Sequence, residues 1–243
     1  QQEAARKLGF TTRKTMSVSQ QLYEGIEIGT GTVGLITYMR TDSVHLSNEA
    51  VDDIRDLISK RYGTENLPTE PRVFKTKSKN AQEAHEAVRP TAIKQSPDLI
   101  KEYLSSDQLK LYTLIWKRTV ACQMIQATIH TVAIDFSCPS QSVFRANGST
   151  IKDPGFMSVY LEGKDDKADD DSEEKLLPEF VEGETIQLHD VIPTQHFTEP
   201  PPRYSEASLV KSLEENDIGR PSTYASIIQT LQARDYVTLE KKR

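Results

Sequence analysis

The first part of the chain shows apolar residues at helical spacing, interrupted by glycines. Residues 1–8 predict one helix and residues from about Thr11 to Glu24 predict a second, and a glycine follows each of them. After a glycine-rich turn, the apolar run at 35–39 predicts a short buried strand. Two helices, a turn and a following β element are the layout of a winged helix-turn-helix domain.

The region after this strand returns to helical patterning. Apolar residues at three- and four-residue spacing, among them Ile54 and Ile58, predict a helix at about 47–62. A polar stretch follows, and two further helices are predicted at 98–104 and at about 107–122. The N-terminal half is therefore expected to be mainly α-helical.

The pattern changes to alternation near residue 126. Residues 127–136 and 142–151 alternate and are rich in β-branched side chains, with a hairpin-type turn predicted at Asn147-Gly148. Residues 184–193 read as another strand. This block is expected to form a β domain.

The last segment is again helical. Ser205 is expected to begin one helix, and Ser222 is expected to cap a second that runs into a β-like stretch at 237–239. That order could repeat the layout of the first segment. The fold class predicted for the whole chain is α+β and multidomain.

Composition and net charge exclude few classes of function. The chain has 243 residues, 36% of them hydrophobic, and a formal net charge of −6. Residues 163–175 hold seven acidic residues and three lysines, and they predict a solvated acidic loop. The pair Asp169 and Asp171 in this loop resembles a metal site, but a flexible loop does not hold magnesium geometry, so no metal ligand is predicted. Overall charge neither supports nor excludes DNA as a partner.

The cysteines and the apolar runs indicate which cellular compartment to expect. Cys122 and Cys138 are the only cysteines, which argues against a disulfide framework or a zinc ribbon and suits a reducing cytoplasm. No apolar run approaches the roughly 20 residues of a membrane span, so no membrane partner is expected. The chain starts without Met inside a predicted helix, and we expect it to be a piece of a longer protein.

The stretch GLITYMRTDS carries the most specific chemistry, because Tyr38 and Arg40 follow a predicted buried strand. A tyrosine hydroxyl is a poor nucleophile at neutral pH, since its ordinary pKa is about 10. A guanidinium about 4 Å away favours the phenolate by up to roughly 4 kcal/mol at an effective dielectric of about 20. The same guanidinium can hold two phosphate oxygens. The pair therefore fits a phosphoryl-transfer nucleophile with its phosphate clamp, and the alternative is a surface tyrosine beside a charged turn.

Three motifs in one order resemble those of bacterial type IA DNA topoisomerases, in the topoisomerase I branch. They are TYMRTDS at 37–43, AQEAHEAVRPT at 81–91 and IGRPSTYASI at 218–227. The related topoisomerase III branch tends to have Pro where Met39 stands. The resemblance covers essentially the whole chain.

The resemblance implies a role for each matching residue. Tyr38 would attack a phosphodiester of single-stranded DNA and become joined to its 5′ phosphate, and Arg40 would position that phosphate. His85 and Arg89 would contact the DNA backbone, with Arg89 on the same helical face as His85. Simpler interpretations remain for both, since His85 could cap a helix and Arg89 could pair with Glu86 or Glu83.

The third motif resembles the DNA-contacting turn of this family. Arg220, Ser222 and Thr223 precede a predicted helix, whose free N–H groups favour anions. Tyr224, just inside that helix, is expected to belong to the core.

The resemblance also implies an architecture. Residues 1–124 would form the tyrosine-bearing winged-helix domain, 125–198 a strand-rich arch, and 199–243 the start of a helical domain that lines the DNA groove. A metal-binding domain with the Mg²⁺ site would precede the chain in the parent enzyme, and a zinc-ribbon region would follow it. We expect this piece to be monomeric, to bind single-stranded DNA in the bacterial cytoplasm near the nucleoid, and to be inactive by itself.

The implied reaction is relaxation of negatively supercoiled DNA through a transient single-strand break. It needs no ATP, and no Walker motif is present. Two other classes stay open. A non-catalytic winged-helix DNA-binding protein would use the same helices without needing Tyr38. A tyrosine recombinase would carry several catalytic arginines and histidines around a helical core.

Overall fold

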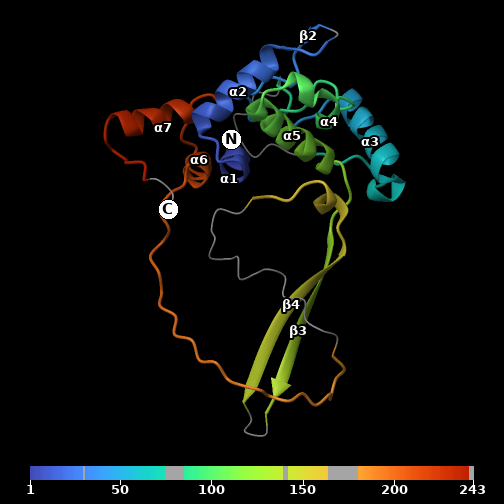
Figure 1. Cartoon of the computed structure of the whole chain (residues 1–243), viewed down its shortest axis with the longest axis vertical. Helices are drawn as coiled ribbons and strands as arrows, with labels where there is room; N and C mark the ends of the chain where they lie inside the picture. Colours follow the sequence, from blue (N-terminus) through green and yellow to red (C-terminus); the bar gives the residue numbers. More distant parts are fainter. Residues whose placement is uncertain (30, 75–84, 139–141, 164–179, 241–243) are drawn as a thin grey trace. The chain divides into compact units, whose positions relative to one another are not determined.

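A computed structural model of the chain describes most of the residues, and helices dominate its N-terminal half (Figure 1). The residues it describes are 1–29, 31–74, 85–138, 142–163 and 180–240. The chain divides into two compact units, one made of residues 1–126, 155–165 and 204–243 and the other of residues 127–154 and 166–203. The expected mixture of α and β structure is confirmed at this coarse level, whereas the winged-helix, arch and groove-lining domains stay predictions.

The first unit is mainly helical. In chain order its elements are α1 (Gln2–Leu8), α2 (Thr12–Glu24), β1 (Ile26–Glu27), β2 (Thr32–Val33), α3 (Asn48–Tyr62), a 3-10 turn at Thr64–Asn66, α4 (Pro97–Ile100), a 3-10 turn at Lys101–Tyr103, α5 (Ser106–Ala121), a 3-10 turn at Gly155–Ser158, α6 (Glu206–Glu215) and α7 (Tyr224–Ala233). Strands β1 and β2 form a small antiparallel hairpin.

The helix ends follow their local capping residues. The Thr11 hydroxyl accepts a hydrogen bond from the Lys14 N–H at 3.1 Å, and the Ser47 hydroxyl accepts one from the Ala50 N–H at 3.3 Å. Gly9 ends α1 in the left-handed conformation, with φ 64°. The predicted boundaries of the first three helices are therefore confirmed to within a residue or two.

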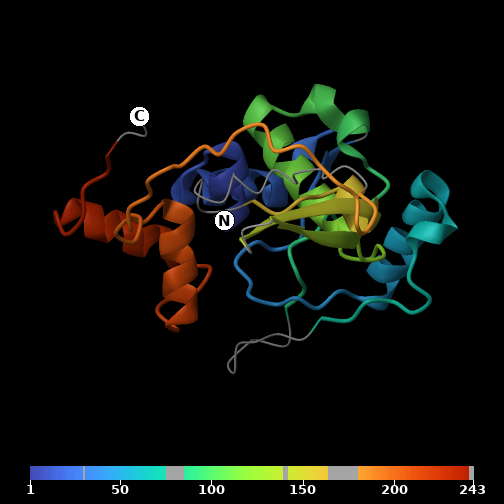
Figure 2. The same ribbon diagram turned by 90° about the horizontal axis from the view of Figure 1, so that it is seen from below.

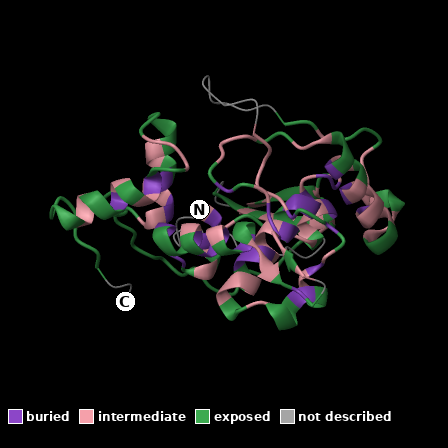
Figure 3. Cartoon of the chain, turned by 90° about the horizontal axis from the view of Figure 1, so that it is seen from above, coloured by how far each residue is buried: buried purple, intermediate pink, exposed green. Residues whose placement is uncertain are grey.

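The core of this unit lies where α2, α3 and α5 pack. Leu22, Ile54, Ile58, Tyr112 and Val120 are all fully or almost fully buried in one cluster. Figure 3 shows the buried positions along the sides of the helices that face one another. Figures 1 and 2 show that α3 and the α6–α7 pair lie on opposite sides of α2 and α5.

Helices α6 and α7 have a small core of their own, formed by Val210, Tyr224 and Ile228. The expectation that Tyr224 is a core residue is confirmed, since its exposed fraction is 5%. The Ser205 hydroxyl accepts a hydrogen bond from the Ser208 N–H at 3.1 Å, so Ser205 caps α6 as predicted.

The second unit is built on one antiparallel hairpin of β3 (Thr128–Ser137) and β4 (Val143–Asp153). The predicted turn at Asn147-Gly148 is wrong, because both residues lie inside β4 opposite Ala133 and Val132. A turn there would leave β3 without its partner strand. The long ladder of cross-strand hydrogen bonds therefore outweighs the local preference of Asn-Gly for a turn.

Two further strand predictions are wrong. Residues 184–193 have no regular structure and are exposed, and residues 237–239 are not a strand either. Each has a strand-like sequence, but a strand needs a partner for its N–H and C=O groups, and neither segment pairs with one within the described residues. The expected repeat of helix, turn, helix and strand near the C-terminus is therefore not formed.

The predicted strand at 35–39 is also wrong, since within the described residues this segment forms a single isolated bridge, between Ile36 and Pro90. The bridge rests on two hydrogen bonds that flank this pair: the Thr37 N–H donates to the Arg89 carbonyl at 2.9 Å, and the Thr91 N–H donates to the Leu35 carbonyl at 3.0 Å. Gly34 is required just before it, because a Cβ at that position would lie 2.6 Å from the carbonyl oxygen of Tyr23. No helix in the described part of the chain is long and apolar enough to cross a membrane.

Candidate active site

Tyr38 lies on the surface of the first unit between two other rings. Its exposed fraction is 39%, and its ring centroid is 5.4 Å from that of Tyr23 and 6.0 Å from that of His85, both in edge-to-face geometry. Tyr23 comes from the end of α2, and His85 comes from the second motif. The fold therefore brings Tyr38 and His85, which are far apart in the sequence, to one place.

The backbone around Tyr38 explains this placement. The Thr37 N–H donates to the Arg89 carbonyl at 2.9 Å, and the Arg89 N–H donates to the Thr37 hydroxyl at 2.9 Å. The Thr37 hydroxyl donates in turn to the Ala87 carbonyl at 2.7 Å. These bonds hold the two motifs side by side without a regular sheet.

The segment 85–89 is not helical, so the prediction that His85 and Arg89 share a helical face is wrong. Its backbone groups bind the Tyr38 segment and the loop after it, for example through the Ala87 N–H, which donates to the His45 carbonyl at 2.8 Å. Pro90 also disfavours helical geometry at the residue before it.

Arg40 lies on the solvent side, two residues after Tyr38. Met39, between them, is 5% exposed, whereas Tyr38 and Arg40 are both exposed. The side chains therefore alternate between inside and outside, although the backbone here is not a strand. Within the described residues the Arg40 side chain has no hydrogen bond or ion pair. Its guanidinium is therefore exposed and available to bind an anion.

Arg89 is engaged within the protein. Its Nε and Nη2 donate to the two carboxylate oxygens of Glu86, each at 2.9 Å, and its Nη1 donates to the Pro90 carbonyl at 2.9 Å. The Glu86 carboxylate also accepts the N–H of Ser47, the residue that caps α3, at 2.8 Å. The predicted alternative in which Arg89 pairs with Glu86 is thus confirmed, while Glu83 lies outside the described residues.

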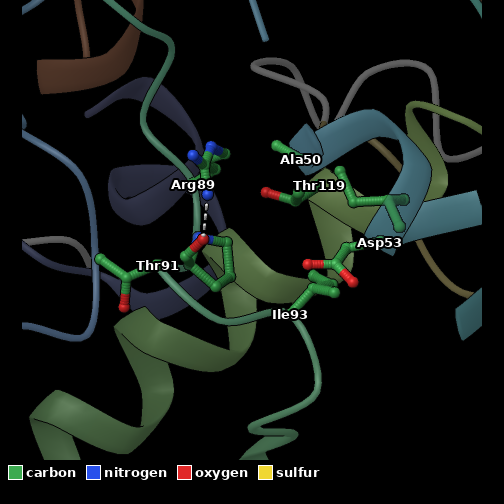
Figure 4. Close-up of a pocket in the computed structure, with 8 residues that line it drawn as sticks. Ala50, Asp53, Arg89, Thr91, Ile93 and Thr119 are labelled. Atoms are coloured by element: carbon green, nitrogen blue, oxygen red, sulfur yellow. Dashed lines mark hydrogen bonds between the residues drawn. The ribbon is translucent and has the colours of Figure 1, made fainter. Parts of the chain in front are cut away.

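A small pocket lies beside Arg89. Figure 4 shows Ala50 and Asp53 of α3, Thr119 of α5 and the segment carrying Thr91 converging on it. The link from the His85 segment to the start of α3 is the hydrogen bond that the Glu86 carboxylate accepts from the Ser47 N–H.

Burial alone would raise the pKa of Glu86, but hydrogen bonds from Arg89 and from the Ser47 N–H outweigh it, so this pKa lies below its ordinary value of 4.5. A carboxyl group with a depressed pKa contributes stability to the folded state that is complete above pH 4.5 and is lost as the pH falls through the folded-state pKa.

We expect Glu86→Gln to lower the free energy of unfolding by about 1–3 kcal/mol at pH 7 and by less at pH 3, measured by urea titration.

The control for Glu86→Gln is Asp56→Asn. Asp56 pairs with Lys60 on the exposed face of α3, at 2.7 Å. That change should cost at most about 0.5 kcal/mol, because exposed ion pairs are screened. Equal losses in the two variants would show that the Glu86 network does not anchor the segment.

The third motif forms a tight turn before α7. The Arg220 N–H donates to the Thr223 hydroxyl at 2.8 Å, and Gly219 has φ 78°. The prediction that Ser222 caps α7 is wrong: Thr223 is the N-cap residue, and its hydroxyl is taken up by Arg220 rather than by the first turn of the helix. Ser222 is exposed and free of that role.

Burial raises the pKa of Tyr224, the first residue of α7, above its ordinary value; the charge of Glu214 adds to this effect and that of Arg220 opposes it. The Arg220 guanidinium donates to the Gly219 carbonyl at 2.7 Å and is half-buried.

The described residues do not fit a magnesium site. No group of three or more His, Cys, Asp or Glu side chains among them could hold a metal ion. Glu86, the carboxylate beside His85, is occupied by Arg89 and Ser47. Asp169 and Asp171 lie outside the described residues.

One residue of the site was missed from the sequence, Tyr23. Tyr23 had a signal: it follows Leu22 on α2, off the buried face marked by Val18 and Leu22, and is itself 40% exposed. An aromatic residue on the outer side of a helix is a candidate for contact with another exposed group.

The comparisons with known proteins agree with these motifs. The family model described as DNA topoisomerase matches residues 1–243, and the chain belongs to this family. The DNA topoisomerase 1 of Xylella fastidiosa is 59% identical over 99% of the chain, and that of Rickettsia conorii is 60% identical over 100% of it. A crystal structure of full-length topoisomerase I from Thermotoga maritima is 36% identical, with a TM-score of 0.81 over 99% of the chain.

The chain is shorter than these relatives. It spans 30% of the Xylella protein, 31% of the Rickettsia protein and 38% of the Thermotoga chain.

Proposed function

We propose that this chain carries the nucleophile of a type IA DNA topoisomerase, which relaxes negatively supercoiled DNA through a transient break in one strand. The observation that carries the proposal is the exposed Tyr38, set against His85 and followed by an Arg40 that is not engaged within the described residues. Membership of the DNA topoisomerase family supports the reaction class.

The proposed chemistry is a transesterification. The Tyr38 oxygen forms a bond to the phosphorus of a single-stranded DNA phosphodiester while the bond from phosphorus to the 3′ oxygen breaks. The phenol loses its proton and the leaving 3′ oxygen gains one. The bond energy is kept in the phosphotyrosine, so the 3′ hydroxyl can reverse the attack without ATP.

The other site residues act around this step. Arg40 binds the non-bridging phosphate oxygens and stabilises their charge in the transition state. The His85 ring packs edge-to-face against Tyr38, and His85 contacts the DNA backbone. Ser222, Thr223 and Arg220 bind a more distant phosphate at the start of α7.

Arg89 has a supporting role in this proposal. Its donors already bind Glu86 and Pro90, so its main role is to hold the His85 segment in place. Its effect on DNA is limited to the electrostatic attraction of its positive charge for the phosphates.

We further propose a division of labour within the longer protein. The carboxylates that hold Mg²⁺, and the acid that protonates the leaving 3′ oxygen, belong to a part of the relatives' length that these 243 residues do not include. When bound, the metal ion supplies positive charge near the DNA phosphates.

This division predicts the behaviour of the 243-residue chain alone. We expect it to bind single-stranded DNA weakly and with steep salt dependence, because only a few cations on an acidic chain can meet phosphates. We expect no cleavage, even with magnesium, since a leaving alkoxide without an acid is very unstable. The measurement is incubation with a labelled oligonucleotide and magnesium, followed by a search for a denaturation-resistant protein–DNA band.

Two outcomes separate the possibilities. A band that vanishes in the Tyr38→Phe variant would mean that the chain holds a complete cleavage site, and the division of labour would be wrong. A band that forms only when the metal-binding part of a family member is added in trans would support it.

A further inference from the structure

The Tyr38 ring is held by few contacts. Its exposed fraction is 39%, and the ring contacts in the described part of the chain are the edge-to-face pairs with Tyr23 and His85. No hydrogen bond to the Tyr38 hydroxyl is formed within the described residues. A nucleophile on a surface loop therefore depends on these two rings for its orientation.

Tyr23 is fixed more firmly than Tyr38. It lies in the last turn of α2, whose neighbouring residue Leu22 is fully buried. The Leu35 N–H donates to the Leu22 carbonyl at 2.7 Å, and Gly34 passes so close to the Tyr23 carbonyl that a side chain there would clash. The end of α2 and the start of the Tyr38 segment are thus joined through the backbone.

The Tyr23 side chain is not part of the buried core. It is 40% exposed, and it lies beside the buried stripe of α2 that Thr15, Val18 and Leu22 form. Within the described residues its hydroxyl has no hydrogen-bond partner. Its contact with Tyr38, at 5.4 Å between ring centroids, is the interaction that the structure shows for this ring.

We propose that Tyr23 is a positioning residue for the Tyr38 nucleophile: its ring limits the rotamers of Tyr38 so that the hydroxyl is presented to the phosphate. This inference rests on the proposed function of Tyr38. Small misplacements of a reacting group are costly, so a ring that restricts the nucleophile contributes to the rate of the chemical step. It contributes little to the affinity for DNA, because it does not need to touch the DNA.

The test uses the longer protein that carries this chain and compares Tyr23→Ala with Tyr23→Phe. Two quantities are measured separately: the single-turnover rate of covalent adduct formation at saturating single-stranded oligonucleotide, and the dissociation constant for that oligonucleotide. We expect Tyr23→Ala to slow adduct formation roughly three- to tenfold, in line with the loss of an edge-to-face aromatic pair. We expect Tyr23→Phe to keep the wild-type rate, and both variants to bind DNA within about twofold of wild type.

The control is Tyr236→Ala, which removes another exposed tyrosine, 69% exposed and without a ring contact in the described part of the chain. It should leave both quantities unchanged. Thermal melting of each variant shows whether it is folded, and Tyr23→Leu, which keeps more of the apolar volume, replaces Tyr23→Ala if the latter unfolds.

Three results would overturn the inference. One is a wild-type adduct rate in Tyr23→Ala or Tyr23→Leu. Another is weaker DNA binding with an unchanged rate at saturation, which would make Tyr23 a stacking platform for bases. The third is a slowed rate that Tyr23→Phe does not restore. Failure of the proposed function can be told apart from failure of this inference, because the Tyr38→Phe variant would then still form the adduct.

Discussion

Tyr38→Phe is expected to abolish formation of the covalent protein–DNA adduct in the longer protein, while single-strand binding stays within a few fold of wild type. The change removes one oxygen atom, and that atom is the proposed nucleophile. Phenylalanine keeps the ring and therefore keeps the edge-to-face contacts with Tyr23 and His85. The measurement is a denaturing gel with an end-labelled oligonucleotide, together with a binding titration on the same preparation.

The matched control for Tyr38→Phe is Tyr204→Phe, which removes the hydroxyl of a tyrosine that is 68% exposed. It should form the adduct at the wild-type level. An adduct in Tyr38→Phe would assign the nucleophile to another of the nine tyrosines. Wild-type relaxation activity without any adduct would favour a non-catalytic role for this segment.

Arg40→Lys is expected to slow cleavage by roughly 10- to 1000-fold; the upper part of this range, about 100- to 1000-fold, corresponds to the loss of a preorganised donor worth about 2.7–4 kcal/mol. Lysine keeps the positive charge but loses the planar fork that binds two phosphate oxygens at once. Because Arg40 has no hydrogen-bond or ion-pair partner among the described residues, the change should not destabilise the fold. The single-turnover cleavage rate and the melting temperature are the measurements.

The control for Arg40→Lys is Arg13→Lys, at an exposed position on α2. It should leave cleavage unchanged. If Arg40→Lys cleaved at the wild-type rate, charge alone would be sufficient and the geometry of the guanidinium fork would have no part in the reaction. If it lost DNA binding as much as cleavage, Arg40 would act in the ground state rather than in the transition state.

Comparison of sequence and structure shows which predictions were secure. The ends of α2 and α3 were predictable because Thr11 and Ser47 cap them through hydrogen bonds within three residues. The motif residues were predictable from their resemblance to a family, and their proposed roles stay predictions. The turn at Asn147-Gly148 failed because its signal is local, whereas the register of β3 and β4 depends on the whole ladder.

The amino-acid sequence by itself determined the helices of the first unit, the family and the motif that contains Tyr38. Those features depend on side-chain spacing and on capping groups a few residues away. Only the tertiary structure decided that Tyr38 contacts His85 and Tyr23, that Glu86 occupies Arg89, and that the Tyr38 segment is an irregular loop. The physical reason is that most of these contacts join segments far apart in the chain, and they depend on how the buried side chains of α2, α3 and α5 pack against one another.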